Sequence, residues 1–260
     1  MESCSIRGSH PVIQSILSAA DRIAGTDVCV LIVGEKGTGK DLLARYIHAA
    51  SPRAAGPFVR IDCQELGAVR GGNALTGGLG HDIAGDRISY GLRERARGGT
   101  LFLDQISALG NELQARLLSA LHAEPAASDV RLLASRFPND ALPSCLAAAG
   151  IALVEIPVPP LRQRRSDIPL LVEHFVELYV GRHGVPPRRI DTEAMVQLWQ
   201  YDWPGNVREL ENLVERVVVL NRSGVIRAAD LPRHVCTVAA KPGEAMAAAG
   251  NGCGIAAGLR

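Results

Sequence analysis

Residues 30–40 read V-L-I-V-G-E-K-G-T-G-K, and this stretch decides the fold. The compact apolar run that ends at the first glycine predicts a buried strand. A helix directly after the lysine is indicated by apolar residues at helical spacing: Leu42, Leu43, Tyr46 and Ile47. A turn of the form G-x-x-x-x-G-K between a strand and a helix predicts a phosphate-binding loop. Its backbone N–H groups and the helix N-terminus both favour an anion.

The candidate nucleotide-binding residues of this loop are Gly34, Glu35, Lys36, Gly37, Thr38, Gly39, Lys40 and Asp41. Lys40 is expected to reach the β- and γ-phosphate oxygens. Asp41 stands where a magnesium-binding Ser or Thr usually follows the lysine. The alternative interpretation is a glycine-rich turn without a ligand.

A second candidate group follows another predicted strand. Residues 98–104 read G-G-T-L-F-L-D, so an apolar strand ends in the carboxylate of Asp104. Beside a phosphate-binding loop, such a carboxylate is expected to hold Mg²⁺ through water. An isolated aspartate at a strand end would otherwise be a turn residue.

Apolar patterns outside these motifs alternate between strand and helix up to residue 156. Further strands are predicted at 58–61, 130–134 and 152–156, and further helices at 12–20 and 113–121. The alternation predicts an α/β domain, a parallel sheet with helices on both faces, over residues 1–158.

The sequence pattern changes at three prolines, Pro157, Pro159 and Pro160. Beyond them the strong patterns are helical, at 168–180, 192–199 and 207–220, and they predict a small all-α domain over residues 159–236. Its core is expected to contain Trp199 and Trp203. The basic run at 162–165 is interpreted as a solvated linker, with a phosphate or inter-subunit role as the alternative. Residues 237–260 are Ala- and Gly-rich and are expected to form a flexible tail.

Bulk properties exclude several classes of protein. The net charge of +1 gives no electrostatic reason to expect a nucleic-acid or membrane partner. Six cysteines without a C-x-x-C pair predict free thiols in a reducing cytoplasm, and Cys29 is expected to be a small core residue. No signal-peptide core or membrane-spanning stretch is found, so a cytoplasmic protein is expected.

Four motifs, in order, resemble the AAA+ domain of sigma-54-dependent transcription activators, bacterial enhancer-binding proteins. They are V-L-I-V-G-E-K-G-T-G-K-D-L-L-A-R-Y-I-H, G-G-T-L-F-L-D-Q-I, P-P-L-R-Q-R-R-S-D-I-P-L-L and W-P-G-N-V-R-E-L-E-N-L. The resemblance covers about Ser5 to Pro232. It implies a P-loop NTPase (AAA+) fold with a helical lid, ATP and Mg²⁺ as ligands, and a ring with ATP between subunits. It also implies that Arg208 senses the γ-phosphate, and it explains Asp41, because the family carries an acidic residue there.

The sequence departs from the family at four positions that serve ATP hydrolysis and sigma-54 contact. Gln105 replaces the glutamate that polarises the attacking water, and Asp62 replaces the asparagine that restrains it. The usual Thr-Asn sensor reads Ser135-Arg136, and the segment up to residue 150 holds no arginine after Arg136, which is left as a candidate finger. Residues 80–85 lack the Phe and Thr of the family's sigma-contacting loop.

These departures predict a degenerate member, a pseudo-ATPase, that binds ATP with weak or absent hydrolysis and impaired sigma-54 contact. Two alternatives stay open: an active ring ATPase that remodels RNA polymerase holoenzyme, and a non-catalytic interaction protein that modulates an intact family member. The expected partners are copies of this chain or a family paralogue. No DNA-binding helix pair is found after Leu231 and no receiver-like domain before Ile6, so promoter targeting is expected to need a partner.

Overall fold

The computed structural model describes residues 6–68, 94–111, 114, 129–141 and 153–236. Five parallel strands form the main sheet, in the order β2-β3-β4-β1-β5. Their bounds are β1 Cys29–Val33, β2 Phe58–Asp62, β3 Thr100–Asp104, β4 Arg131–Arg136 and β5 Leu153–Pro157. The predicted parallel sheet is confirmed, and each strand lies within two residues of its predicted position.

The sheet is buried on both faces, which is why its strands read as continuous apolar runs. On one face Val30 and Ile32 of β1 pack with residues of α1 (Pro11–Ala24) and α2 (Lys40–Ala49). On the other face Cys29 and Leu31 pack with residues of α3 (Cys63–Ala68) and of the short helix η1 (Ile106–Ala108). Alternate side chains of one strand therefore belong to two different cores.

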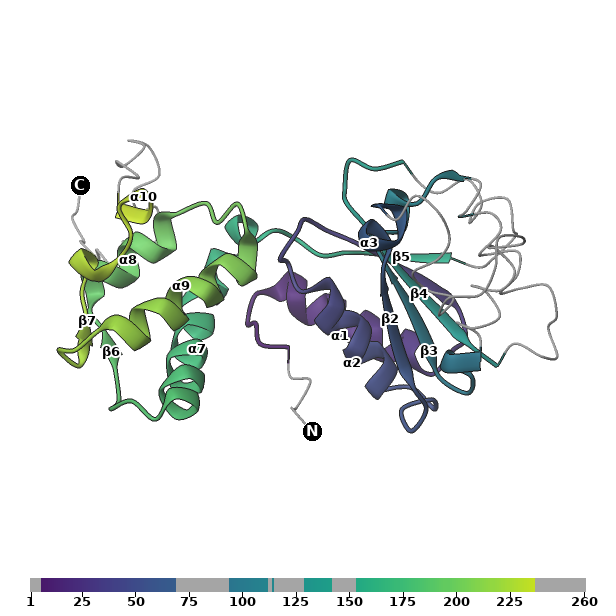
Figure 1. Ribbon diagram of the computed structural model, residues 1–260, viewed down its shortest axis with the longest axis horizontal. Helices are drawn as coiled ribbons and strands as arrows, with labels where there is room; N and C mark the ends of the chain where they lie inside the picture. Colours follow the sequence, from purple (N-terminus) through teal and green to yellow (C-terminus); the bar gives the residue numbers. More distant parts are fainter. Residues whose placement is uncertain (1–5, 69–93, 112–113, 115–128, 142–152, 237–260) are drawn as a thin grey trace, which may run out of the picture.

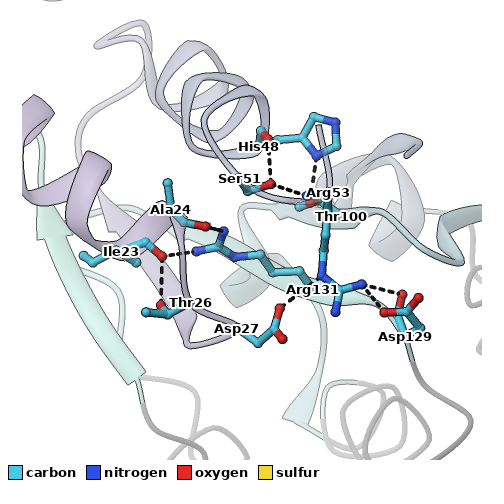
Figure 2. A network of polar contacts seen from close by, with 10 residues as sticks. All are labelled: Ile23, Ala24, Thr26, Asp27, His48, Ser51, Arg53, Thr100, Asp129 and Arg131. Carbon is cyan, nitrogen blue, oxygen red and sulfur yellow. Dashed lines mark hydrogen bonds and ion pairs between the residues drawn. The ribbon is translucent and has the colours of Figure 1, made fainter. Parts of the chain in front are cut away.

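A buried arginine ties the N-terminal edge of the sheet to α1 (Figure 2). Arg131, at the start of β4, is 1% exposed and donates to the carbonyl oxygens of Ala24 and Ile23 at 2.8 Å each. These carbonyls belong to the last turn of α1, where no following turn of the helix supplies N–H donors for them. Burial lowers the pKa of the Arg131 guanidinium. This network lies at the opposite end of the strands from the glycine-rich loop, so we assign it a structural role.

Replacing Arg131 with methionine is expected to destabilise the fold by about 1–3 kcal/mol, because the Ala24 carbonyl loses its donor while buried. The Ile23 carbonyl keeps the N–H and hydroxyl of Thr26. Urea unfolding measures the loss. Arg53→Met is the control, since Arg53 pairs with Asp27 and Asp129, whose side chains are 73% and 66% exposed. That variant should lose about 1 kcal/mol or less. Equal losses in both variants would contradict the assignment.

The helical lid follows β5 and lies to one side of the sheet (Figure 1). Its long helices are α7 (Ile168–His183), α8 (Thr192–Gln200) and α9 (Asn206–Leu220). Its short elements are η2 (Leu161–Gln163), η3 (Arg165–Asp167), η4 (Ala228–Asp230) and α10 (Arg233–Cys236). The all-helical prediction misses one detail, a parallel pair of short strands, β6 (Arg189–Ile190) and β7 (Val225–Ile226). Two residues are too few to show a strand period.

The two tryptophans of the lid differ. Trp203 is fully buried and its indole N–H donates to the Leu198 carbonyl at 2.8 Å, as a core residue requires. The prediction for Trp199 is wrong: it is 45% exposed, and the Arg165 guanidinium lies over its ring at 5.7 Å. Helical spacing alone did not show that Trp199 faces away from the core.

Several predictions lie outside the described residues: the helix at 113–121, the segment at 80–85, the tail at 237–260 and three of the cysteines. Within the described ranges, Cys29, Cys63 and Cys236 are free thiols. Cys29 is buried as predicted, and burial raises the pKa of its thiol to about 12. None of the helices in the described ranges is both long and apolar enough to span a bilayer.

Candidate nucleotide-binding site

The candidate site lies at the C-terminal ends of β1, β3 and β4, the edge where open parallel sheets bind ligands. An open cavity of about 1050 Å³ separates this edge from the lid. The predicted residues that line it are Lys36, Gly37, Gly39, Lys40, Asp41, Asp104, Gln105 and Arg208. Residues far apart in the sequence thus meet around one space large enough for a small-molecule ligand.

The backbone of the loop depends on two glycines. Gly37 has φ +78° and Gly39 has φ +99°, both in the region that side chains rarely adopt. A Cβ added to Gly37 would also lie 2.2 Å from the Gly205 carbonyl oxygen of the lid. Gly39 directly precedes α2, so the backbone N–H groups of the loop lie next to those at the N-terminus of the helix, and both can bind an anion.

Lys40 is the buried cation of the site, at 6% exposure. Its ammonium donates to the carbonyl oxygens of Gly34 and Glu35 at 2.8 and 2.9 Å, and lies 5.0 Å from the centroid of the Phe137 ring. Burial lowers the pKa of Lys40, and the charge of Asp104 opposes that shift. A desolvated ammonium whose acceptors are neutral carbonyls gains most from an entering anion.

The lid holds the loop through contacts that the sequence analysis did not predict. Glu35 accepts two hydrogen bonds from Arg162, at 2.6 and 2.8 Å. Asn206, fully buried, donates to the Lys36 carbonyl at 3.0 Å and to Glu35 at 3.2 Å. The backbone N–H of Arg208 donates to the Gly37 carbonyl at 3.3 Å. The loop and the lid are therefore one bonded unit.

The basic run at 162–165 is not a solvated linker, and that interpretation is wrong. Arg164 is 3% exposed and donates to the Thr38 carbonyl at 3.0 Å. Arg165 pairs with Asp202 at 2.6 Å. With Arg162 on Glu35, three arginines of the run bind groups of this chain. Arg162 and Arg164 therefore join the lid to the loop, whereas Arg165 binds within the lid.

Asp104 has both carboxylate oxygens engaged by the protein. The Ser135 hydroxyl donates to Oδ1 at 2.6 Å, and the Arg60 guanidinium donates to Oδ2 at 2.6 Å. Arg60 comes from β2, the neighbouring strand, and was not predicted. Across the described residues, no cluster of three or more His, Cys, Asp or Glu side chains is arranged to hold a metal ion. A metal ion held at Asp104 would lie beside the guanidinium of Arg60, which is 2.6 Å from the carboxylate.

Gln105 has an unusual local structure. Its backbone has φ +59° and ψ +58°, a left-handed conformation that costs a non-glycine residue about 1–2 kcal/mol. Its N–H donates to the Ser135 hydroxyl at 2.9 Å, while its buried Oε1 has no hydrogen-bond partner among the described residues. Asp62 stands where the family's asparagine would restrain the residue at position 105. It accepts a hydrogen bond of 2.9 Å from the backbone N–H of Gln64 at the start of α3.

Arg136 points into its own loop. Its guanidinium donates to the carbonyl oxygens of Asp140, Phe137 and Pro138 at 2.8–3.3 Å, and it pairs with Glu155 at 3.4 Å. The next residue, Phe137, is the one that reaches Lys40. The residue that follows β4 and contacts the loop is therefore Phe137. Arg136 stabilises the turn at residues 137–140 through its hydrogen bonds to the carbonyls there.

A smaller, largely apolar cavity of about 120 Å³ adjoins the loop. Ile13 and Ile16 of α1, Leu43 of α2, Phe175 of α7 and Val158 line it, together with Thr38 and Gly39 of the loop. A cavity of this lining suits a flat apolar group attached to a phosphate chain. Sequence patterns could not indicate it, because its walls come from segments that lie far apart in the chain.

Two family profiles match separate parts of the chain. The family described as Sigma-54 interaction domain matches residues 6–128, and the AAA+ ATPase lid domain matches residues 162–248. Among curated relatives, the nitrogen assimilation regulatory protein NtrX of Azorhizobium caulinodans is 39% identical over 230 residues, which is 82% of this chain and 50% of that protein. The transcriptional regulatory protein ZraR of Escherichia coli is 37% identical over 255 residues, 88% of this chain and 56% of that protein.

Solved structures agree with these matches. NtrX from Brucella abortus in complex with ATP matches with a TM-score of 0.71 at 30% identity, covering 93% of this chain and 57% of that one. The same protein in complex with ADP matches with a TM-score of 0.70. The chain spans about half the length of these relatives. With its parallel sheet, glycine-rich loop and lid, the chain belongs to the sigma-54 interaction AAA+ domains of NtrX-, ZraR- and NtrC-like bacterial regulators.

Proposed function

We propose that this chain is an ATP-binding regulatory domain of transcription that hydrolyses ATP weakly or not at all. The loop, Lys40 and Arg208 would hold the phosphates, and the apolar cavity beside the loop would take the base. The solved relative that holds ATP supports the choice of nucleotide. Bound ATP would then act by mass action, stabilising the joined loop and lid.

The observation that carries the second half of the proposal is the amide of Gln105 directly after Asp104. A general base must accept the proton of the attacking water, and an amide cannot do so at neutral pH. Loss of such a base costs a factor of about 100 or more in rate. The orphaned Oε1 of Gln105 can orient a water molecule but not activate it.

Two further features of the site support slow turnover. Arg136 is bound to three carbonyls of its own loop, so its use as a finger toward a neighbouring subunit would require breaking those bonds. Phe137 offers no hydrogen bond where it meets Lys40. Trans-acting arginines are worth a factor of about 1,000 or more in phosphoryl transfer, so the absence of a free one matters at least as much as the loss of the base.

We further propose that the partners are other copies of this chain or an intact family member, with ATP controlling the association. Contact with sigma-54 is proposed to be impaired, on the sequence of residues 80–85.

Phosphate release from Mg-ATP, measured over a wide range of protein concentration, tests this function. The expected result is a rate at or only slightly above that of Lys40→Ala, with no cooperative rise as the protein concentration increases. A rate above that background that rises cooperatively with concentration would show an active ring ATPase, and the proposal would be wrong. Unfolding temperatures of both proteins, without nucleotide, confirm that they are compared in the folded state.

A further inference from the structure

Arg60 lies among the carboxylates of the candidate site. Besides its 2.6 Å contact with Asp104, its Nε lies 3.4 Å from Asp41 Oδ1 and its Nη2 lies 3.6 Å from Asp62 Oδ2. The three aspartates come from β3, α2 and β2. One guanidinium therefore lies within 4 Å of acidic groups from three elements, at the edge where the phosphates would lie.

We propose that Arg60 is an internal counter-cation that takes the place of the divalent metal, so that this chain binds ATP without Mg²⁺. The inference rests on the proposed ATP binding and defines its chemistry.

Asp104 is already bonded to two protein donors, and one of them is a cation. Ser135 donates to one oxygen and Arg60 to the other, so a metal-bound water at Asp104 would have to share the carboxylate with both. A divalent cation placed beside Asp104 would also meet the guanidinium charge at close range, where like charges repel strongly. The contact with Asp104 raises the pKa of Arg60, so its charge is permanent.

Arg60 is also placed to serve the nucleotide. Its side chain is 37% exposed and lines the same cavity as Lys40 and Arg208. A guanidinium offers five N–H donors in a planar fork, more than its carboxylate partners require, and phosphate oxygens are acceptors of the right geometry. The three cations would surround a phosphate chain from β2, the loop and the lid.

The test is the affinity for ATP, measured by calorimetry in excess EDTA and again in excess Mg²⁺. The wild type should bind with equal affinity in both conditions, within about threefold. Arg60→Met should bind about tenfold more weakly than the wild type in EDTA and recover when Mg²⁺ is added. Arg45→Met is the charge-matched control: Arg45 pairs with Asp41 at 3.0 Å from the exposed side and should behave like the wild type. Thermal unfolding without ligand checks that all variants fold.

Either of two results would overturn the inference while leaving ATP binding intact. One is a wild type that binds ATP in Mg²⁺ and loses that binding in EDTA. The other is an Arg60→Met protein that binds in EDTA as tightly as the wild type. If the wild type binds ATP in neither condition, the proposed function itself fails and the inference falls with it.

Discussion

Lys40→Ala is expected to weaken ATP binding on the order of 100-fold, or ~2.7 kcal/mol. Lys40 is a buried cation at the N-terminus of α2, and its ammonium donates to the carbonyls of Gly34 and Glu35 and lies over the Phe137 ring. An entering phosphate replaces weak acceptors by a charged one. Calorimetric titration with ATP measures the loss.

Lys36→Ala is the matched control for this variant. Lys36 belongs to the same loop, but its side chain is exposed, and its contact with the lid is made by its backbone carbonyl. A loss of about threefold or less is expected, since only an exposed charge is removed. Equal losses for the two lysines would show that net charge, and not the position of Lys40, determines affinity.

Trp203→Ala should destabilise the lid by about 3–5 kcal/mol, the usual range for removing a fully buried aromatic side chain. Trp203 is 0% exposed, lies against Tyr201 with ring centroids 5.1 Å apart, and donates to the Leu198 carbonyl. It precedes the turn that carries Asn206, so loosening it should also loosen the lid from the loop and weaken ATP binding.

Trp199→Ala tests the same residue type at an exposed position of the same lid. Its ring is 45% exposed and contacts Arg165, so a change of about 0.5 kcal/mol is expected. Urea unfolding of the two variants, followed by far-UV circular dichroism, gives the comparison. A small loss for Trp203 or a large one for Trp199 would contradict the assignment of the lid core.

The local chemistry of the site could be predicted from the sequence because it depends on neighbouring residues. The strand, glycines and lysine of residues 30–40 are contiguous, and Asp104 ends an apolar run. Contacts between distant residues could not be predicted in this way. Glu35 and Arg162 are 127 residues apart, and no period or motif connects them.

Arg60 was missed for a related reason. On β2 it stands between the apolar residues Val59 and Ile61, so it reads as the outward-facing residue of an ordinary strand. Only the parallel register, which places Asp62 beside Asp104, brings that outward face over the carboxylate. A side chain that alternation labels as exposed is thereby part of the site.

Backbone strain is found at the candidate site and at the lid turn beside it. In the described part of the chain, three residues other than glycine have positive φ: Gln105, Trp203 and Asn206. Gln105 directly follows Asp104. Trp203 and Asn206 belong to the turn of the lid that contacts the glycine-rich loop. Such conformations persist only where the surrounding structure enforces them, and they cluster at functional sites.

The most direct test of the central claim follows the fate of bound ATP. Radiolabelled ATP is mixed with Mg²⁺ and excess protein, so that every nucleotide is bound, and samples are quenched over time and separated. The account predicts that nearly all the label stays in ATP, with loss at or only slightly above that in the Lys40→Ala mixture. Rapid conversion of the bound ATP to ADP and phosphate, far ahead of that control, would contradict it and would show that the chain keeps a working ATPase site despite Gln105.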